Sequence, residues 1–219
     1  MYIPTIQPYP MPSREDLPDN HVTWRPQATR SVLLIHDMQK YFIDPFPQDA
    51  SPATELVEHT AQLRNTAIAM SIPVAYTAQP GSMSEAQRGL LSDFWGPGMA
   101  ANSERCIVEL VKPRPGDWIL PKWRYSAFHR TDLLSLMRDA GRDQLICCGV
   151  YGHVGIQATL VDALSHDIEG FLAADAIADF DHGRHKATLS YVASRCAMVD
   201  TTEGLIADLV GVMPNGEPR

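Results

Sequence analysis

The sequence predicts an α/β fold: a single Rossmann-like domain with a sheet of about six mostly parallel strands and helices on both faces. Short apolar runs without polar alternation, such as residues 31–35, are typical of strands buried on both faces. Segments with apolar residues at helical spacing, such as residues 54–70, alternate with these runs, as in a parallel α/β sheet. A chain of 219 residues, 45% of them hydrophobic, is long enough for one sizeable core.

The individual elements follow in order along the chain. The expected strands cover residues 31–35, 73–77, 118–120, 144–149, 171–174 and 197–199. The expected helices cover residues 54–70, 84–94, 131–141, 154–166 and 183–194, and a last helix follows Thr201. Ser84 with Gln87 forms a capping-box pattern, Thr131 and Thr201 are N-cap residues, and Gly141 is a helix-ending glycine.

The N-terminal residues 1–29 are rich in proline and predict an extended arm on the surface of the one domain, 1–219. They lack the basic and apolar regions of a signal peptide, and no apolar run reaches the ~18 residues that a membrane span needs. The net charge of −8 argues against nucleic acid as a partner. Four cysteines make no disulfide framework, and Cys147 and Cys148 are expected as buried thiols of a cytoplasmic protein.

Residues 149–155, Gly-Val-Tyr-Gly-His-Val-Gly, carry the strongest functional signal. They follow a predicted buried strand and precede a predicted helix, which is the junction where an α/β hydrolase-like enzyme usually places its nucleophile. Gly155, at the position of a catalytic thiol, has no side chain. The sequence therefore predicts chemistry without a covalent protein intermediate.

Polar residues gather just after the predicted strands. Asp37 follows the first, Gln79 the second and Lys122 the third, while Tyr151 and His153 follow the fourth. In an open parallel sheet, ligands bind outside the carboxyl ends of the strands, so we expect these residues to form one site. The alternative for Asp37 is that it only caps a helix starting near Met38.

Several segments resemble the isochorismatase family, which shares its fold with cysteine hydrolases such as nicotinamidases. The matching segments are residues 33–39, 76–80, 93–98, 122–128, 149–151 and 173–180. Residues 79–83 and 194–199 are similar to the stand-alone enzymes of phenazine-type pathways. The resemblance implies one isochorismatase-like hydrolase domain, and we expect no aryl carrier domain after the last helix.

The resemblance also implies a reaction. The superfamily triad is Asp, Lys and Cys; Asp37 and Lys122 match the first two, and Gly155 stands at the third, as in true isochorismatases. The implied substrate is isochorismate or 2-amino-2-deoxyisochorismate, whose vinyl ether is hydrolysed with release of pyruvate. Such hydrolysis needs a strong acid, for which Asp37 is the candidate, and requires neither metal nor cofactor.

Substrate-binding residues are assigned on the same resemblance. Gln79, Arg88 and Lys122, with Tyr151 and the backbone at Gly155, are expected to hold the substrate. The pocket walls are expected to be Phe42, Trp95, Tyr125 and Phe128. The alternatives are a solvated helix position for Arg88 and ordinary core packing for the aromatic residues. The resemblance further implies a cis peptide between Val150 and Tyr151.

Other interpretations remain open at this point. The chain could be an amide hydrolase of the cysteine-hydrolase type, which the glycine at position 155 argues against, or a non-catalytic binding partner that kept the fold. His182 and His185, near Asp179 and Asp181, could form a metal cluster, although a His-x-x-His spacing alone is a weak signal. We expect a homodimer, because relatives commonly form one. No residue decides between an amino and a hydroxyl group at ring position 2, and the phenazine-like segments favour the amino substrate.

Overall fold

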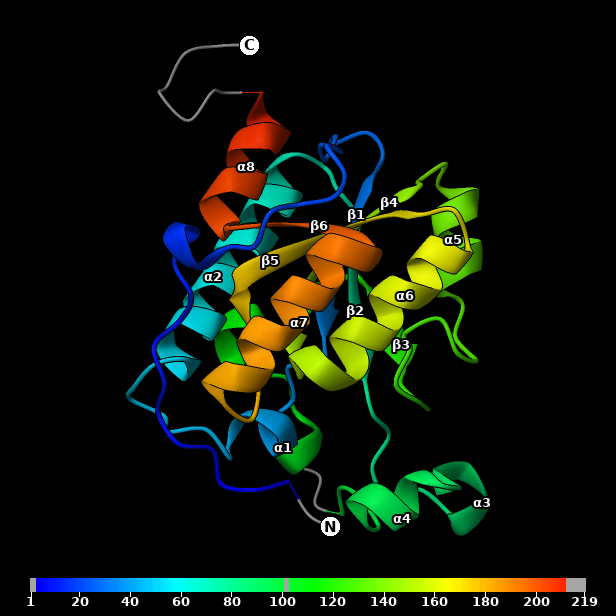
Figure 1. Ribbon diagram of the computed structural model, residues 1–219. Coiled ribbons are helices and arrows are strands. Elements are labelled where there is room, and N and C mark those ends of the chain that lie inside the picture. The colour runs from blue at the N-terminus through cyan, green and yellow to red at the C-terminus, as the bar shows by residue number, and fades with distance from the viewer. Residues whose placement is uncertain (1–2, 101–102, 212–219) are drawn as a thin grey trace.

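A parallel sheet of six strands forms the centre of the protein in the computed structural model, which describes residues 3–100 and 103–211 (Figure 1). The strand order is β3-β2-β1-β4-β5-β6, and every neighbouring pair is parallel. The strands are β1 Ser31–His36, β2 Val74–Ala78, β3 Trp118–Pro121, β4 Gln144–Val150, β5 Glu169–Ala178 and β6 Ala197–Asp200. The predicted fold class and its six strands are confirmed, and β5 is longer than the 171–174 expected.

Helices cover both faces of the sheet, as predicted. The helices are α1 Lys40–Ile43, α2 Ala53–Ala69, α3 Glu85–Arg88, α4 Leu91–Trp95, α5 Leu133–Asp139, α6 Gln157–Ser165, α7 His182–Arg195 and α8 Thr202–Val210, with 3-10 turns at Arg14–Asp16, Ser103–Arg105 and Glu109–Val111. In Figure 1, α6 and α7 lie in front of the sheet, and α2 and α8 lie behind it and to the left. Among the described residues, none of these helices combines the length and apolar character that a bilayer crossing requires.

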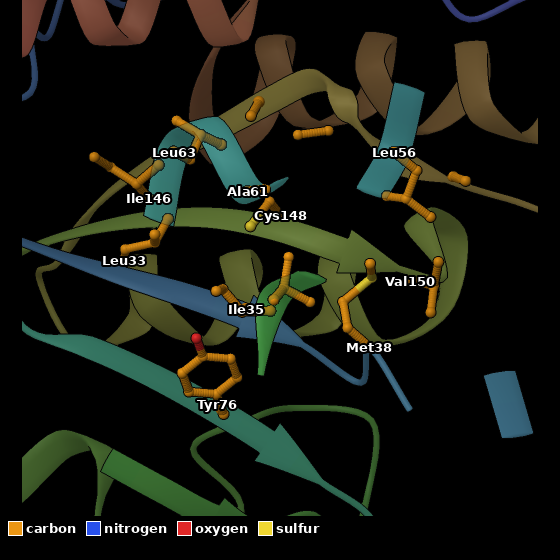
Figure 2. Close-up of a cluster of buried hydrophobic side chains, with 14 of the residues drawn as sticks. Leu33, Ile35, Met38, Leu56, Ala61, Leu63, Tyr76, Ile146, Cys148 and Val150 are labelled. Atoms are coloured by element: carbon orange, nitrogen blue, oxygen red, sulfur yellow. The ribbon is translucent and has the colours of Figure 1, made fainter. Parts of the chain in front are cut away.

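Successive side chains of each buried strand point to opposite faces of the sheet and pack into two separate hydrophobic cores. Leu33 and Ile35 of β1 point into one core with α2 and α8, while Val32 and Leu34 point into the other with α5, α6 and α7. Figure 2 shows the first core, where Leu33 and Ile35 lie below Leu63 and Ala61 of α2. Two buried faces explain why these strands are apolar throughout instead of alternating.

Three predicted helices differ from the structure, one of them only at its start, where Asp132 and not the predicted Thr131 is the N-cap residue of α5. The segment 84–94 is not one helix: α3 ends at Arg88, because Gly89 has a φ of 52°, and α4 starts at Leu91. The segment expected to start a helix at 154 begins instead with a π-helical turn, Gly152–Ile156, that leads into α6. The cap predicted at Thr201 is confirmed, since its hydroxyl accepts the N–H of Gly204.

The N-terminal arm is extended but is not confined to the surface. Ile6 and Tyr9 are buried in the core that contains α2. The Tyr9 hydroxyl accepts the backbone N–H of Asp179 at 2.7 Å and lies 3.2 Å from Nδ1 of His185. The pattern of prolines predicted the extended shape of the arm. The apolar residues between the prolines, Ile6 and Tyr9, determine which part of the protein the arm packs against.

The strand order reverses between β1 and β4, so these two neighbours carry the chain away in opposite directions along the sheet. Such a switch point leaves a crevice at the carboxyl ends of the two strands. The residues that follow β1 and β4 therefore occupy the position where an open α/β sheet binds its ligand.

Candidate active site

Asp37 lies at this crevice, directly after β1, in a left-handed conformation with a φ of 51°. Its carboxylate accepts the Thr77 hydroxyl at 2.5 Å through one oxygen and the Lys122 ammonium at 3.1 Å through the other. The helix that follows begins only at Lys40 and is preceded by Gln39. Asp37 is therefore not a helix cap, and the functional interpretation of this residue is the one that its contacts support.

The Asp37–Lys122 pair is almost removed from water, with 7% and 2% of each residue exposed. Burial alone would raise the pKa of Asp37, but the fields of His36 and Lys122 and the hydrogen bonds from Thr77 and Lys122 together hold it below its usual value. Burial lowers the pKa of Lys122, against the opposing effect of Asp37. In the free protein Asp37 is thus held in its ionised form, with the Lys122 amine hydrogen-bonded to it.

Arg88 and Gln79 form a second polar group at the crevice. The Arg88 guanidinium donates to the side-chain oxygen of Gln79 at 3.0 Å and, through Nε, to the carbonyl of Gly96 at 2.8 Å. Only 4% of Arg88 is exposed, so it is not a solvated helix residue. Gln39 fixes Gln79 in turn: its side-chain oxygen accepts the Gln79 backbone N–H at 2.7 Å, and its amide donates to the Gln79 carbonyl at 3.1 Å.

These groups face one cavity, which encloses about 570 Å³ including its open mouth. The lining residues are Ile3, Asp37, Tyr41, Phe42, Gln79, Arg88, Leu91, Trp95, Lys122, Arg124, Tyr125, Val150, Tyr151, Val154 and Gly155. Nine of the ten predicted site residues are among them.

Phe128 is the exception, and its prediction as a pocket wall is corrected here. It is buried in the core with α5 and α6, and its ring lies 5.4 Å from the ring of His166. Of the three remaining predicted walls, Trp95 donates its indole N–H to the Tyr125 hydroxyl at 2.9 Å. This contact joins the segment of α4 to the loop after β3 across the cavity mouth.

Tyr151 lies in the cavity wall, after a cis peptide that joins it to Val150 as the resemblance implied. Its hydroxyl donates to the carbonyl of Phe42 at 2.7 Å, and burial raises its pKa well above the usual value. The Tyr151 hydroxyl therefore stays protonated, and its oxygen remains available as an acceptor for a ligand.

No thiol of the described residues lines the cavity. Cys147 and Cys148 are fully buried within β4, and burial raises the pKa of both. Cys196 is buried beside β6, and the exposed Cys106 lies outside the cavity lining. A nucleophilic route of the cysteine-hydrolase type thus lacks its attacking group.

The proposed histidine cluster on α7 is also explained by packing. Nε2 of His185 lies 2.9 Å from the carbonyl of Ala174, and its Nδ1 faces Tyr9, so both nitrogens are engaged inside the protein. Within residues 3–100 and 103–211, no three His, Cys, Asp or Glu side chains come together as a metal site would require. His153 pairs with the buried Asp179 at 2.5 Å, outside the main cavity.

Sequence reasoning missed the residues that hold the acid in place. Thr77, which bonds Asp37, is the β2 residue paired in register with His36, so parallel pairing of the first two strands could have found it. Gln39, which positions Gln79, lies within the matched segment 33–39 but had no assigned role. Arg124 and Val154, which lie inside segments singled out from the sequence but had no assigned role, also line the cavity, as do Tyr41 and Ile3, which had no prior signal.

Comparison with known proteins gives one consistent result. The family model described as the isochorismatase domain matches residues 31–204. Phenazine biosynthesis protein PhzD1 of Pseudomonas aeruginosa is 54% identical over 93% of this chain and 98% of its own length. The isochorismatase of Bacillus subtilis is 50% identical over 95% of this chain and 67% of its own length. The crystal structure of a cysteine hydrolase from Pseudomonas syringae has the same fold, with a TM-score of 0.77 at 23% identity, covering 85% of this chain and 95% of that one.

Proposed function

Because the chain belongs to the isochorismatase family, we propose that it is a vinyl-ether hydrolase that releases pyruvate from an isochorismate-type substrate. The observation that carries this proposal is a buried Asp37–Lys122 pair that faces a cavity lined by no thiol. An acid without a neighbouring nucleophile suits a reaction that begins with protonation of carbon. The same pair would be of no use to a non-catalytic scaffold, which could bury apolar residues there at lower cost.

In the proposed mechanism, Asp37 delivers its proton to the terminal methylene carbon of the enolpyruvyl ether. The new C–H bond leaves an oxocarbenium ion, which the Asp37 carboxylate stabilises electrostatically. Water adds to the cationic carbon and returns a proton to Asp37. The hydroxyl proton of the resulting hemiketal then moves to the ether oxygen that is attached to the ring. The bond between this oxygen and the hemiketal carbon breaks, which gives pyruvate and a ring alcohol.

Asp37 must gain a proton when the substrate binds, because it is ionised in the free enzyme. A substrate carboxylate beside Lys122 would compete for the ammonium charge that now holds the pKa of Asp37 down. The same carboxylate, together with closure of the cavity, would raise the pKa of Asp37. In this mechanism, binding of the substrate is therefore coupled to protonation of Asp37.

Arg88 is proposed to hold a substrate carboxylate with the two guanidinium N–H bonds that remain beside those donated to Gly96, Gln79 and Trp95. Replacement by lysine keeps the charge but loses the planar fork, and with it about 1.5–3 kcal/mol of charge-assisted hydrogen bonding. We expect Arg88→Lys to lower kcat/KM by about 10–100-fold, mainly through KM. Arg64→Lys is the matched control, since Arg64 bonds Tyr76 and Lys112 outside the cavity. Equal effects of the two substitutions would contradict the assignment.

The amino substrate, 2-amino-2-deoxyisochorismate, is the one we favour, on the similarity to a relative named for phenazine biosynthesis. The test is to incubate the purified, metal-free protein with each of the two substrates and to follow pyruvate by coupling to lactate dehydrogenase. Pyruvate release identifies a vinyl-ether hydrolase, and the ratio of the two kcat/KM values identifies the substrate. No pyruvate from either compound would overturn the proposed function.

We also propose that the enzyme acts as a homodimer in the cytoplasm. None of the four cysteines, all of which lie in the described part of the chain, is joined to another by a disulfide, which fits a reducing compartment. Light scattering coupled to gel filtration gives the oligomeric state directly, and a monomeric mass at micromolar concentration would contradict a stable dimer.

A further inference from the structure

The first and last glycines of the 149–155 segment both lie against one residue, His36. A Cβ atom built on Gly149 would lie 2.1 Å from the carbonyl oxygen of His36, and Gly149 also has a φ of 112°. A Cβ atom built on Gly155 would lie 2.2 Å from Cε1 of the His36 ring, 2.8 Å from Nε2 and 3.3 Å from Nδ1. The end of β4 thus packs against the backbone of His36, and the turn that follows it packs against the ring of His36.

The His36 ring is fixed in this position. The residue is the last of β1, is paired in register with Gly149 and is 1% exposed. Its Nδ1 lies 2.7 Å from the carbonyl of Val150, and since a carbonyl only accepts, Nδ1 carries the proton. Burial lowers the pKa of His36 to about 4, so the ring is neutral near pH 7. Moving the ring would leave a buried carbonyl without its donor.

Backbone conformation does not explain the glycine at position 155. Gly155 lies in the π-helical turn Gly152–Ile156 and, unlike Gly149, does not have a positive φ. An L-residue could therefore adopt this backbone without strain. What forbids a side chain there is the space, and the three nearest atoms that fill it all belong to the His36 ring.

We infer that His36 is a positioning residue that keeps a side chain out of position 155 and so fixes the class of reaction. Gly155 lines the same cavity as Asp37 and Lys122, and a side chain built on it would point at the ring of His36, the residue before Asp37. The imidazole takes the space that such a side chain needs, and Asp37, the next residue in the chain, is left to act alone. The pairing of a ring at position 36 with a glycine at position 155 rests on packing and does not depend on the identity of the substrate.

The test is a double-substitution cycle in the full chain, read first by thermal unfolding. Gly155→Cys alone should lower Tm by about 5–10 °C, because overpacking against a fixed ring is destabilising. His36→Ala should lower Tm by itself, since it opens a cavity and frees the Val150 carbonyl. Adding Gly155→Cys to His36→Ala should then cause no further loss, because the ring that the new side chain meets is gone. If the alanine variant does not fold, His36→Val takes its place.

His185→Ala is the matched control, because His185 is equally buried and neutral but bonds Tyr9 and Ala174. With this partner the two losses in Tm should add. Losses that also add for the His36 pair would overturn the inference, as would a Gly155→Cys variant as stable as the natural protein.

The second readout is alkylation by iodoacetamide, followed peptide by peptide in the mass spectrometer. In the His36→Ala/Gly155→Cys variant, the thiol introduced at position 155 should be alkylated in the folded protein, because Gly155 lines the cavity and the space left by the ring adjoins it. Cys147 and Cys148, fully buried in β4, serve as internal standards of a protected thiol. Protection at position 155 equal to theirs would show that the vacated space does not open on the cavity and would overturn the inference. If His36 only stabilised the fold, its removal would not make a thiol at position 155 more reactive towards iodoacetamide than Cys147 and Cys148.

Discussion

Asp37→Asn is expected to lower kcat for pyruvate release by at least about 10²-fold and as much as about 10⁴-fold, the range of general acid catalysis. Asparagine has the shape of the aspartate and can still accept the Thr77 hydroxyl with its side-chain oxygen. Its amide cannot deliver a proton to carbon, and it carries no negative charge to stabilise the oxocarbenium ion. The expected loss is therefore in kcat, with binding of the substrate carboxylates changed much less.

Asp37→Asn also leaves the Lys122 ammonium buried without its carboxylate, so part of any loss could reflect stability. Thermal unfolding of the variant separates the two effects. Asp175→Asn is the matched control: its side chain is 13% exposed against 10% for Asp37, and each carboxylate has a histidine neighbour. Asp175 lies outside the cavity lining and should keep kcat within about threefold of the natural enzyme. A loss of kcat in Asp37→Asn no larger than this would remove Asp37 from the role of acid.

Residues that follow strands were predictable because the sheet itself brings them together. Asp37, Gln79 and Lys122 lie 42–85 positions apart in the chain, yet each was placed by the end of an apolar run. Parallel pairing of adjacent strands then aligns their carboxyl ends at one edge. Strand ends are a local feature of sequence, so the site could be located before its geometry was known.

Contacts made by single side chains were harder to predict. Phe128 was assigned to the cavity because it shares a matched segment with Lys122 and Tyr125, but segment membership does not say which way a ring points. Tyr125 lines the cavity, whereas Phe128, three positions later, packs into the core. The direction of a loop side chain depends on turns that periodicity does not describe.

The role of the glycine at position 155 shows the same limit. The sequence correctly indicated that no thiol is present at this position, but it offered no steric reason for the glycine within the protein itself. The structure gives one, since the missing side chain would meet the His36 ring. His36 lay just beyond the expected strand 31–35 and received no role, because a single buried histidine leaves no periodic signal in the sequence.

The pH dependence of the reaction is the second large expected effect, and its sign follows from the ion pair. The pKa of Asp37 in the free enzyme is below the ordinary 3.8, because the effects of His36, Lys122 and Thr77 outweigh burial. If the protonated acid is required, the competent fraction of free enzyme falls about tenfold for each pH unit above that pKa. In the complex, where a substrate carboxylate engages Lys122, the pKa of Asp37 is raised.

We therefore expect kcat/KM to fall about tenfold per unit from pH 5 to pH 8, because this parameter reports the free enzyme. The value of kcat should stay level at the acid end of this range and fall only above the raised pKa of Asp37 in the complex. Both profiles come from initial rates of pyruvate release, at substrate concentrations that span KM at each pH. A level kcat/KM across the range would mean that the proton on Asp37 comes from Lys122 rather than from solvent, because transfer within the pair leaves the number of bound protons unchanged. That outcome would contradict the coupling of substrate binding to proton uptake, while leaving Asp37 as the group that protonates carbon.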